Sequence, residues 1–266
     1  MKHFIKFGFI LGLSISSKAF SSDPVQGIYF GLLGEISRTI SNPSLNFNIG
    51  NNQFALSNTS PITLSPVGGG GGFSLGYRIN TVRLEGQLLF NINNYGELKV
   101  GSCTLISPNV MGPEGICPAT ISNDQGIGLG FSGNTTGIYG MFNLFYDFLS
   151  SDPNTKMFPY IGVGVGGAII KNKANFESNK YNALGSTFSK TVSTSNNGIA
   201  AQGIIGIGSN LDDFATLGID IRYTSAFKPN NNNNNSSTTS ASGSSNQLGI
   251  VTLNFTGTYA LDKGSD

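Results

Sequence analysis

The sequence predicts an all-β protein, an eight-stranded antiparallel up-and-down transmembrane β-barrel with four long extracellular loops. Two observations along the 266-residue chain support this prediction. Eight stretches alternate apolar and polar residues, and successive side chains of a strand point to opposite faces. The connections alternate between a few residues and roughly twenty to forty residues. An apolar outer face, a polar inner face and long loops at one end are typical of barrels in the bacterial outer membrane.

The eight predicted strands follow from this period of two. They occupy residues 27–37, 71–78, 82–92, 137–148, 158–171, 198–208, 215–224 and 248–261. The long connections are dominated by Asn, Ser, Thr and Gly, a composition that predicts mobile loops. They occupy residues 39–69, 93–135, 172–197 and 225–246.

Alternation is visible in each of the first three strands. The apolar face of the first strand begins at Ile28, and its polar face includes Glu35. The second strand sets apolar residues against glycine and serine and ends at Arg78. The third strand is the clearest, because Arg83 and Glu85 lie between valine and leucine positions. Each strand therefore has one face suited to lipid and one suited to polar contacts.

The other five strands repeat the pattern. The fourth strand places Asp147 on its polar face, and the fifth alternates β-branched residues with glycines. Glycines on one face are expected where large neighbours fill a narrow interior. The sixth strand opposes isoleucines to Gln202, and the seventh opposes apolar residues to Asp220 and Arg222. The eighth alternates Thr and Asn with apolar residues.

Aromatic residues near the strand ends have two interpretations. They fit the aromatic girdles that mark the two membrane interfaces, and they equally fit ordinary strand positions. The residues concerned are Tyr77, Phe148, Phe158, Tyr160, Phe214 and Tyr223.

Residues 1–19 predict a secretory signal peptide, with cleavage before Phe20. The segment has a basic start, a short apolar run and small residues at the cleavage position. Its apolar run is about half of the ~20 residues that a membrane-spanning helix needs, which favours a signal peptide over an anchor. We expect residues 20–266 to form one domain. This segment carries 12 basic and 14 acidic residues, so its net charge of −2 gives no indication of a nucleic-acid partner.

The two cysteines, Cys103 and Cys117, lie in one polar connection. Export into an oxidising compartment predicts a disulfide between them. The bond would close a loop of ~15 residues and stabilise the fold by roughly 3 kcal/mol. A zinc site is disfavoured because two cysteines without histidine do not complete the usual ligand set.

Seven charged residues fall on the polar face and are predicted to share the barrel interior. Buried charges are stable when they are paired, and eight strands leave an interior just wide enough for side chains to fill. The favoured hypothesis is therefore a structural ion-pair network that plugs the barrel, and the alternative is a gated, narrow ion path. The residues are Glu35, Arg78, Arg83, Glu85, Asp147, Asp220 and Arg222.

An enzymatic function is not expected. The only histidine, His3, lies in the predicted signal peptide, so the exported chain can form no Ser-His-Asp triad. No glycine-rich run is followed by a Gly-Lys-Ser/Thr phosphate motif. The sequence accordingly predicts no catalytic residue, metal or cofactor.

Three motifs resemble a known family. Residues 76–86 (GYRINTVRLEG), 143–147 (NLFYD) and 159–166 (PYIGVGVG) are similar to opacity-type eight-stranded outer-membrane barrels. The nearest resemblance is to the major surface antigens of Anaplasma and Ehrlichia. The resemblance implies a surface antigen or adhesin in the outer-membrane lipid whose exposed loops contact host surface molecules. Some relatives are discussed as porins, which leaves a narrow porin or ion channel as the alternative function.

Overall fold

The computed structural model describes most of the chain. It covers residues 26–40, 44–51, 54–64, 67–100, 103–106, 114–115, 129–150, 155–178, 189–212, 214–227 and 247–261. The predicted signal peptide and its cleavage position lie outside these residues. None of the described residues forms a helix long and apolar enough to cross a bilayer.

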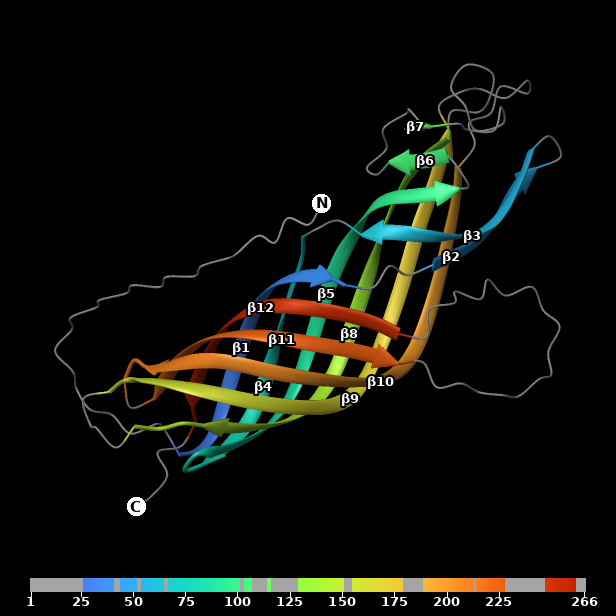
Figure 1. Ribbon diagram of the computed structural model, residues 1–266. Helices are drawn as coiled ribbons and strands as arrows, with labels where there is room; N and C mark the ends of the chain where they lie inside the picture. Colours follow the sequence, from blue (N-terminus) through green and yellow to red (C-terminus); the bar gives the residue numbers. More distant parts are fainter. Residues whose placement is uncertain are drawn as a thin grey trace, which may run out of the picture.

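Eight antiparallel strands form a closed ring (Figure 1). Each strand pairs with its neighbour along the chain, and the first and last strands pair with each other to close the barrel. The predicted all-β class with eight antiparallel strands in a ring is therefore confirmed. The strands are β1 (Gly27–Thr39), β4 (Gly68–Ile79), β5 (Val82–Val100), β8 (Leu129–Asp147), β9 (Met157–Ser178), β10 (Ser189–Asn210), β11 (Ala215–Phe227) and β12 (Gln247–Ala260).

Parts of the predicted long loops are strand. Four further strands lie within the first two predicted loops, namely β2 (Ser44–Asn51), β3 (Phe54–Leu64), β6 (Cys103–Ile106) and β7 (Glu114–Gly115). The predicted third loop is strand at both ends, because β9 continues to Ser178 and β10 begins at Ser189. Segments rich in Ser, Thr and Asn can form strands here because the hydrogen bonds between strands are made by backbone groups, which do not depend on the side chains.

The strand extensions form a wall that rises beyond the ring. Residues 93–100, 129–136, 171–178 and 189–198 extend β5, β8, β9 and β10, and we call these segments the projecting wall. Figure 1 shows β8, β9 and β10 rising together past the ends of β1, β11 and β12. Along residues 189–198 the described pairing partner of β10 is β9, and pairing with β11 starts at Ile199.

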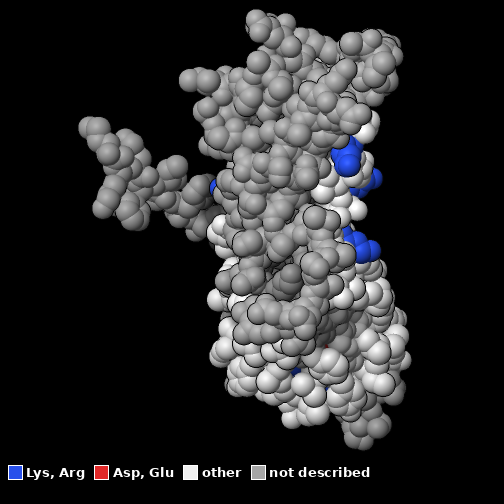
Figure 2. All heavy atoms as spheres, turned by 90° about the vertical axis from the view of Figure 1, so that its right-hand side faces the viewer, with Lys and Arg blue, Asp and Glu red and all other residues white. Residues whose placement is uncertain are grey.

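The outer face of the ring is apolar. Outward side chains such as Phe142 and Val165 are 71% and 64% exposed, and no described charged residue lies among them on β9 between Met157 and Ile169. Figure 2 shows this surface as largely uncharged in its lower part, with Lys and Arg side chains higher up. A soluble monomer rarely exposes a continuous apolar patch of this size.

The aromatic residues divide between the two faces. Four of the six predicted girdle positions, Tyr77, Phe148, Phe214 and Tyr223, are exposed on the outside. Phe158 and Tyr160 instead point into the barrel and are buried. The reason is their even spacing from Gly162, which places them on the inner face of β9.

Inward glycines make room for large side chains. A Cβ atom on Gly162 would lie 2.6 Å from the Phe145 ring, and one on Gly208 would lie 2.5 Å from the Phe158 ring. By contrast, a Cβ atom on Gly203, which faces outward, would meet no atom within 4 Å. Of the glycines predicted to thin the inner face, Gly162 packs against an aromatic ring, whereas Gly164 lies beside the Asn143 and Gln202 side chains.

Tight turns lie at the end of the barrel opposite the projecting wall. Asn80 joins β4 to β5 with a φ of 51°, a left-handed conformation that Asn tolerates better than most residues. Its backbone N–H donates to Oε1 of Gln26 at 2.6 Å. Asp212 Oδ1 accepts the N–H groups of Phe214 and Ala215 at 2.8 and 2.7 Å, which fixes the turn before β11.

Candidate functional site in the barrel interior

The interior near the tight turns is centred on one carboxylate. Asp147 enters from β8, and Arg78 and Arg83 enter from β4 and β5. Oδ2 of Asp147 lies 2.8 Å from Nη2 of Arg78, and Oδ1 lies 2.9 Å from Nη2 of Arg83. Nε of Arg83 also donates to Oδ1 at 3.0 Å. All three side chains are buried, so the charges are shielded from bulk water.

Aromatic rings line the two guanidinium groups. The Arg83 guanidinium lies 4.5 Å from the ring centre of Phe145 and 4.8 Å from that of Tyr160. Arg78 lies 5.4 Å from the ring centre of Phe158. Cation–π attraction between these groups adds to the ion pairs. Of the two interpretations of Phe158 and Tyr160, the ordinary strand position therefore holds, with both rings against interior arginines.

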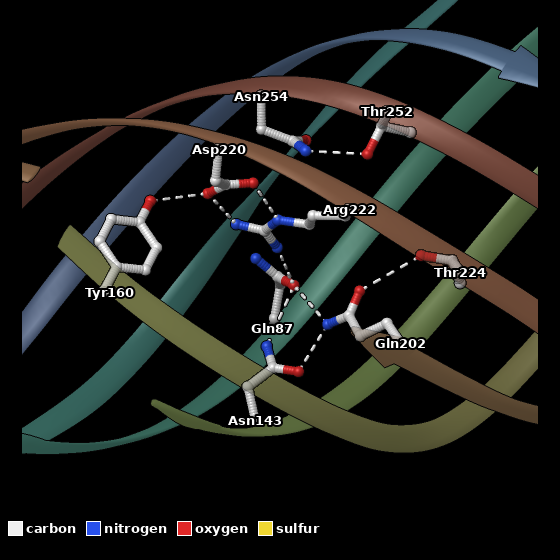
Figure 3. Close-up of polar contacts among 9 residues, drawn as sticks. All are labelled: Gln87, Asn143, Tyr160, Gln202, Asp220, Arg222, Thr224, Thr252 and Asn254. Atoms are coloured by element: carbon white, nitrogen blue, oxygen red, sulfur yellow. Dashed lines mark hydrogen bonds and ion pairs between the residues drawn. The ribbon is translucent and has the colours of Figure 1, made fainter. Parts of the chain in front are cut away.

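A second cluster occupies the middle of the barrel (Figure 3). Arg222 donates through Nε and Nη2 to the two oxygens of Asp220, at 2.6 and 2.9 Å. The Tyr160 hydroxyl donates to Oδ2 of Asp220 at 2.9 Å. Because Tyr160 also lies beside Arg83, it connects the two ionic clusters.

Neutral amides extend this cluster across the barrel. Arg222 Nη1 donates to Oε1 of Gln87 at 2.8 Å, and Asn143 Nδ2 donates to the same oxygen at 3.2 Å. Gln202 Nε2 donates to Oδ1 of Asn143 at 2.5 Å, and Thr224 donates to Oε1 of Gln202 at 3.3 Å. These residues come from four strands on both sides of the interior, and Tyr160 of the same cluster adds a fifth (Figure 3). The network therefore ties opposite walls together.

The seven predicted interior residues are all buried, but they do not form one ion-pair network. Three ion pairs join Arg78, Arg83, Asp147, Asp220 and Arg222. Among the described residues, Glu35 and Glu85 lie in no ion pair. Glu35 accepts a hydrogen bond from Asn91 at 2.5 Å, and Glu85 accepts one from the Tyr29 hydroxyl at 3.1 Å.

The barrel also contains an apolar layer that was not predicted from the sequence. Leu33, Leu89, Tyr139, Met141 and Ile250 are buried together, with small residues of neighbouring strands packed around them. The available signal was their spacing, since each lies on the inward face of its strand. These residues were not recognised as inward because the prediction identified the inward face by its charged residues.

Aromatic rings also pack on the projecting wall. Tyr95 and Phe131 stack with ring centres 5.6 Å apart and planes 3° apart. Phe176 lies 5.4 Å from Phe131 at an angle of 45°. All three side chains are at most 2% exposed. This packing joins β5, β8 and β9 beyond the closed ring.

Two small cavities remain in the charged part of the interior. One is bordered by Glu85, Asp220 and Arg222, and the other by Tyr29 and Arg78. Each is about 10 Å³, which is room for about one water molecule. Arg83 and Thr258 border both cavities.

The described residues contain no group of three or more His, Cys, Asp or Glu side chains that could hold a metal ion. Cys103 begins β6. Cys117 lies outside the described residues, so the Cys103–Cys117 disulfide stays a prediction.

Fold and interior together define the class of protein: an eight-stranded barrel with an apolar outside and a polar, charged inside. Comparison with known proteins does not assign the chain to a family, because it matches no family model and no curated protein. The matching solved structures include eight-stranded outer-membrane barrels. The resemblance to the Anaplasma and Ehrlichia surface antigens therefore stays a prediction.

Three of these structures cover nearly the whole chain. Neisserial surface protein A is 14% identical, with a TM-score of 0.37, over 89% of this chain and 99% of its own. Ail of Yersinia pestis, in complex with sucrose octasulfate, is 13% identical, with a TM-score of 0.38, over 88% and 98%. The N-terminal barrel of Pseudomonas aeruginosa OprF is 11% identical, with a TM-score of 0.31, over 88% and 99%. At these values the likenesses assign neither a ligand nor an activity to the chain.

Proposed function

We propose that the protein is a bacterial outer-membrane barrel with a closed interior that acts as a surface antigen or adhesin without enzymatic activity. Its projecting wall and the adjoining extracellular connections would contact host surface molecules. The observation that carries the proposal is the inverted polarity of the barrel, with apolar side chains outside and buried charges inside. An apolar outer face of this kind is stable when it is surrounded by lipid.

The height of the apolar belt supports a transmembrane position. On β9 the outward apolar residues run from Met157 to Ile169, which is about 40 Å along the strand. At a strand tilt of about 40° this corresponds to about 30 Å along the barrel axis. The hydrocarbon core of a bilayer is also about 30 Å thick.

The upper edge of the belt is sharp. On five strands an outward isoleucine is followed directly by an outward polar residue. The pairs are Ile36 and Arg38, Ile92 and Asn94, Ile138 and Thr136, Ile169 and Lys171, and Ile199 and Asn197. The projecting wall begins at this edge, so it would stand in water outside the membrane.

The packed interior favours surface contact over transport. Ion pairs, amide hydrogen bonds and an apolar layer follow one another along the barrel, and the two cavities near Arg83 are each the size of a water molecule. Conduction would require these contacts to separate. The projecting wall, by contrast, presents exposed Ser, Thr, Asn and Lys side chains that are free to meet a partner.

A narrow ion channel is the second candidate. The observation that favours it is that Arg83 borders both cavities, so movement of this side chain would open space beside each of them. Single-channel conductance of the barrel in planar bilayers separates the two functions. A silent wild-type barrel, with or without leak in Arg83→Ala and Arg222→Ala, supports the closed interior. Steady, ion-selective steps from the wild type would make transport the leading function.

The surface role is tested by shortening the projecting wall. Asn175 and Thr191 are paired across β9 and β10, so an Asn-Gly turn replacing residues 176–190 would join the strands at that pair. Bacteria displaying this variant should adhere less to host cells than bacteria displaying the wild type. Gly203→Ala, which adds a methyl group in open space on the outer face, is the matched control. Adhesion equal to wild type in a folded, surface-displayed variant would argue against the wall as the contact surface.

A further inference from the structure

Two lysines lie directly above the apolar belt on the outer face of β9. Lys171 is the first outward residue beyond Ile169, and Lys173 is the next. Both side chains are exposed. They are two residues apart on one strand face, so their Cα atoms lie about 7 Å apart. The pair therefore stands where the belt ends and the projecting wall begins.

Hydrogen-bonding side chains flank the two lysines on both neighbouring strands. Lys171 is in register with Thr136 of β8 and Ser195 of β10. Lys173 is in register with Asn134 and Ser193. These six residues, which we call the lysine patch, share the outer face across three strands: Asn134, Thr136, Lys171, Lys173, Ser193 and Ser195.

The patch carries no acidic residue. The strands β8, β9 and β10 contain two carboxylates, Asp147 and Glu177. Asp147 is buried inside the barrel. Glu177 lies four residues beyond Lys173, about 13 Å along the strand, which exceeds the Debye length of about 8 Å at physiological ionic strength. Figure 2 shows basic side chains, and no acidic ones beside them, on the upper described surface.

The backbone under the patch is fixed from the inner face. Thr135 donates to Oδ1 of Asn172 at 2.7 Å, and Asn172 donates to the Thr194 hydroxyl at 3.4 Å. These contacts link the three strands at the same level as Lys171. The lysines therefore project from a rigid sheet rather than from a loop.

We propose that the lysine patch binds the phosphate group of an anionic lipid in the leaflet that surrounds the projecting end of the barrel. Its lysines supply the positive charge, and its hydroxyl and amide groups supply further hydrogen bonds to the phosphate oxygens. The acyl chains would lie on Ile169 and the belt below, so the site is continuous with the lipid-facing surface. The inference rests on the proposed transmembrane position. Each lysine near an anionic membrane surface is expected to change lipid binding by about fivefold.

The test uses the full chain in vesicles with one fluorescent reporter. The sequence has no tryptophan, so Ile138→Trp places a single indole beside Ile169, at the edge of the belt and outside the lysine patch. Quenching by brominated phosphatidylglycerol and by brominated phosphatidylcholine is compared at equal mole fraction. The anionic lipid should quench more strongly, and Lys171→Gln/Lys173→Gln should remove that preference, by about fivefold for each lysine.

The control removes two positive charges elsewhere. Arg38→Gln/Lys190→Gln changes exposed residues of β1 and β10 outside the patch and should retain the preference. Equal quenching by both lipids, or a preference that survives in Lys171→Gln/Lys173→Gln, would overturn the inference. Inorganic phosphate that abolishes the preference, where sodium chloride of equal ionic strength does not, would assign the patch to free phosphate and overturn the lipid assignment. Absence of quenching by either lipid would instead count against the transmembrane position itself.

Discussion

Arg83 and Asp147 meet twice on one oxygen: Nε and Nη2 of the guanidinium lie 3.0 and 2.9 Å from Oδ1 of the carboxylate. The other oxygen of Asp147 lies 2.8 Å from Nη2 of Arg78. One carboxylate therefore compensates two buried guanidinium groups. Its loss would leave both positive charges without their ion-pair partner inside the barrel.

Asp147→Asn should therefore destabilise the barrel strongly. Removing one partner of a buried ion pair typically costs about 3–5 kcal/mol in the free energy of unfolding. Urea unfolding in lipid vesicles, followed by far-UV circular dichroism, measures the change. Glu177→Gln removes an exposed carboxylate and should change the free energy by less than about 0.5 kcal/mol. A similar small change for Asp147→Asn would show that the two arginines are solvated in another way.

Glu35→Gln should destabilise the barrel far less than Asp147→Asn, or even stabilise it. Glu35 is buried, lies in no ion pair among the described residues and accepts a hydrogen bond from Asn91, which a glutamine oxygen can also accept. Neutralising such a buried carboxylate removes its desolvation penalty while keeping the hydrogen bond. The same urea experiment should show a loss of less than about 1 kcal/mol, or a gain in stability. A loss as large as that for Asp147→Asn would mean that Glu35 needs its negative charge.

Gly162→Ala should be destabilising, whereas Gly203→Ala should be tolerated. The added methyl group at Gly162 would lie 2.6 Å from the Phe145 ring, but at Gly203 it would meet nothing within 4 Å. Overpacking of this kind costs about 1–3 kcal/mol. If the clash is the cause, Phe145→Leu should reduce the cost of Gly162→Ala in a double-mutant cycle. Additive effects of the two substitutions would point to backbone strain instead.

A charge in the middle of the apolar belt should cost more than one at its edge. Val163 lies at the centre of the outward run on β9, whereas Asn197 lies just above the belt on β10. Val163→Arg should lower the free energy of unfolding in vesicles by about 2–4 kcal/mol, and Asn197→Arg by at most about 1 kcal/mol. Equal and small costs at both positions would indicate that water, and not lipid, surrounds the belt.

The closed ring could be predicted because period-two alternation persists through every barrel strand. Leu84 and Glu85, for example, can be placed on opposite faces from the sequence of their own strand, without knowing which strands lie beside it. The strands β2 and β3 were assigned to a loop because of their Asn, Ser and Thr content. The same signal was nevertheless present in β2, where Leu45, Phe47 and Ile49 alternate with polar residues or glycine.

The interior was only partly predictable for a related reason. Charge identified Asp147 and Arg222 as inward residues, but which carboxylate meets which guanidinium depends on the stagger between strands, and alternation does not encode stagger. The inward positions of Phe158 and Tyr160 were available from their spacing to the inward Gly162. Their aromatic character pointed instead to a membrane interface. Here spacing was the better guide than residue type.

The pairing of β1 with β12 has a consequence for how the chain reaches its folded state. The seam joins Tyr29 to Ala260, residues 231 positions apart, so the ring closes only after the last strand has been synthesised. Contacts between such distant residues form slowly, because the intervening chain loses its freedom before the contacts stabilise it. Until closure, both seam strands expose unpaired backbone that can pair with other chains. The chain is therefore most exposed to pairing with other copies before the seam has formed.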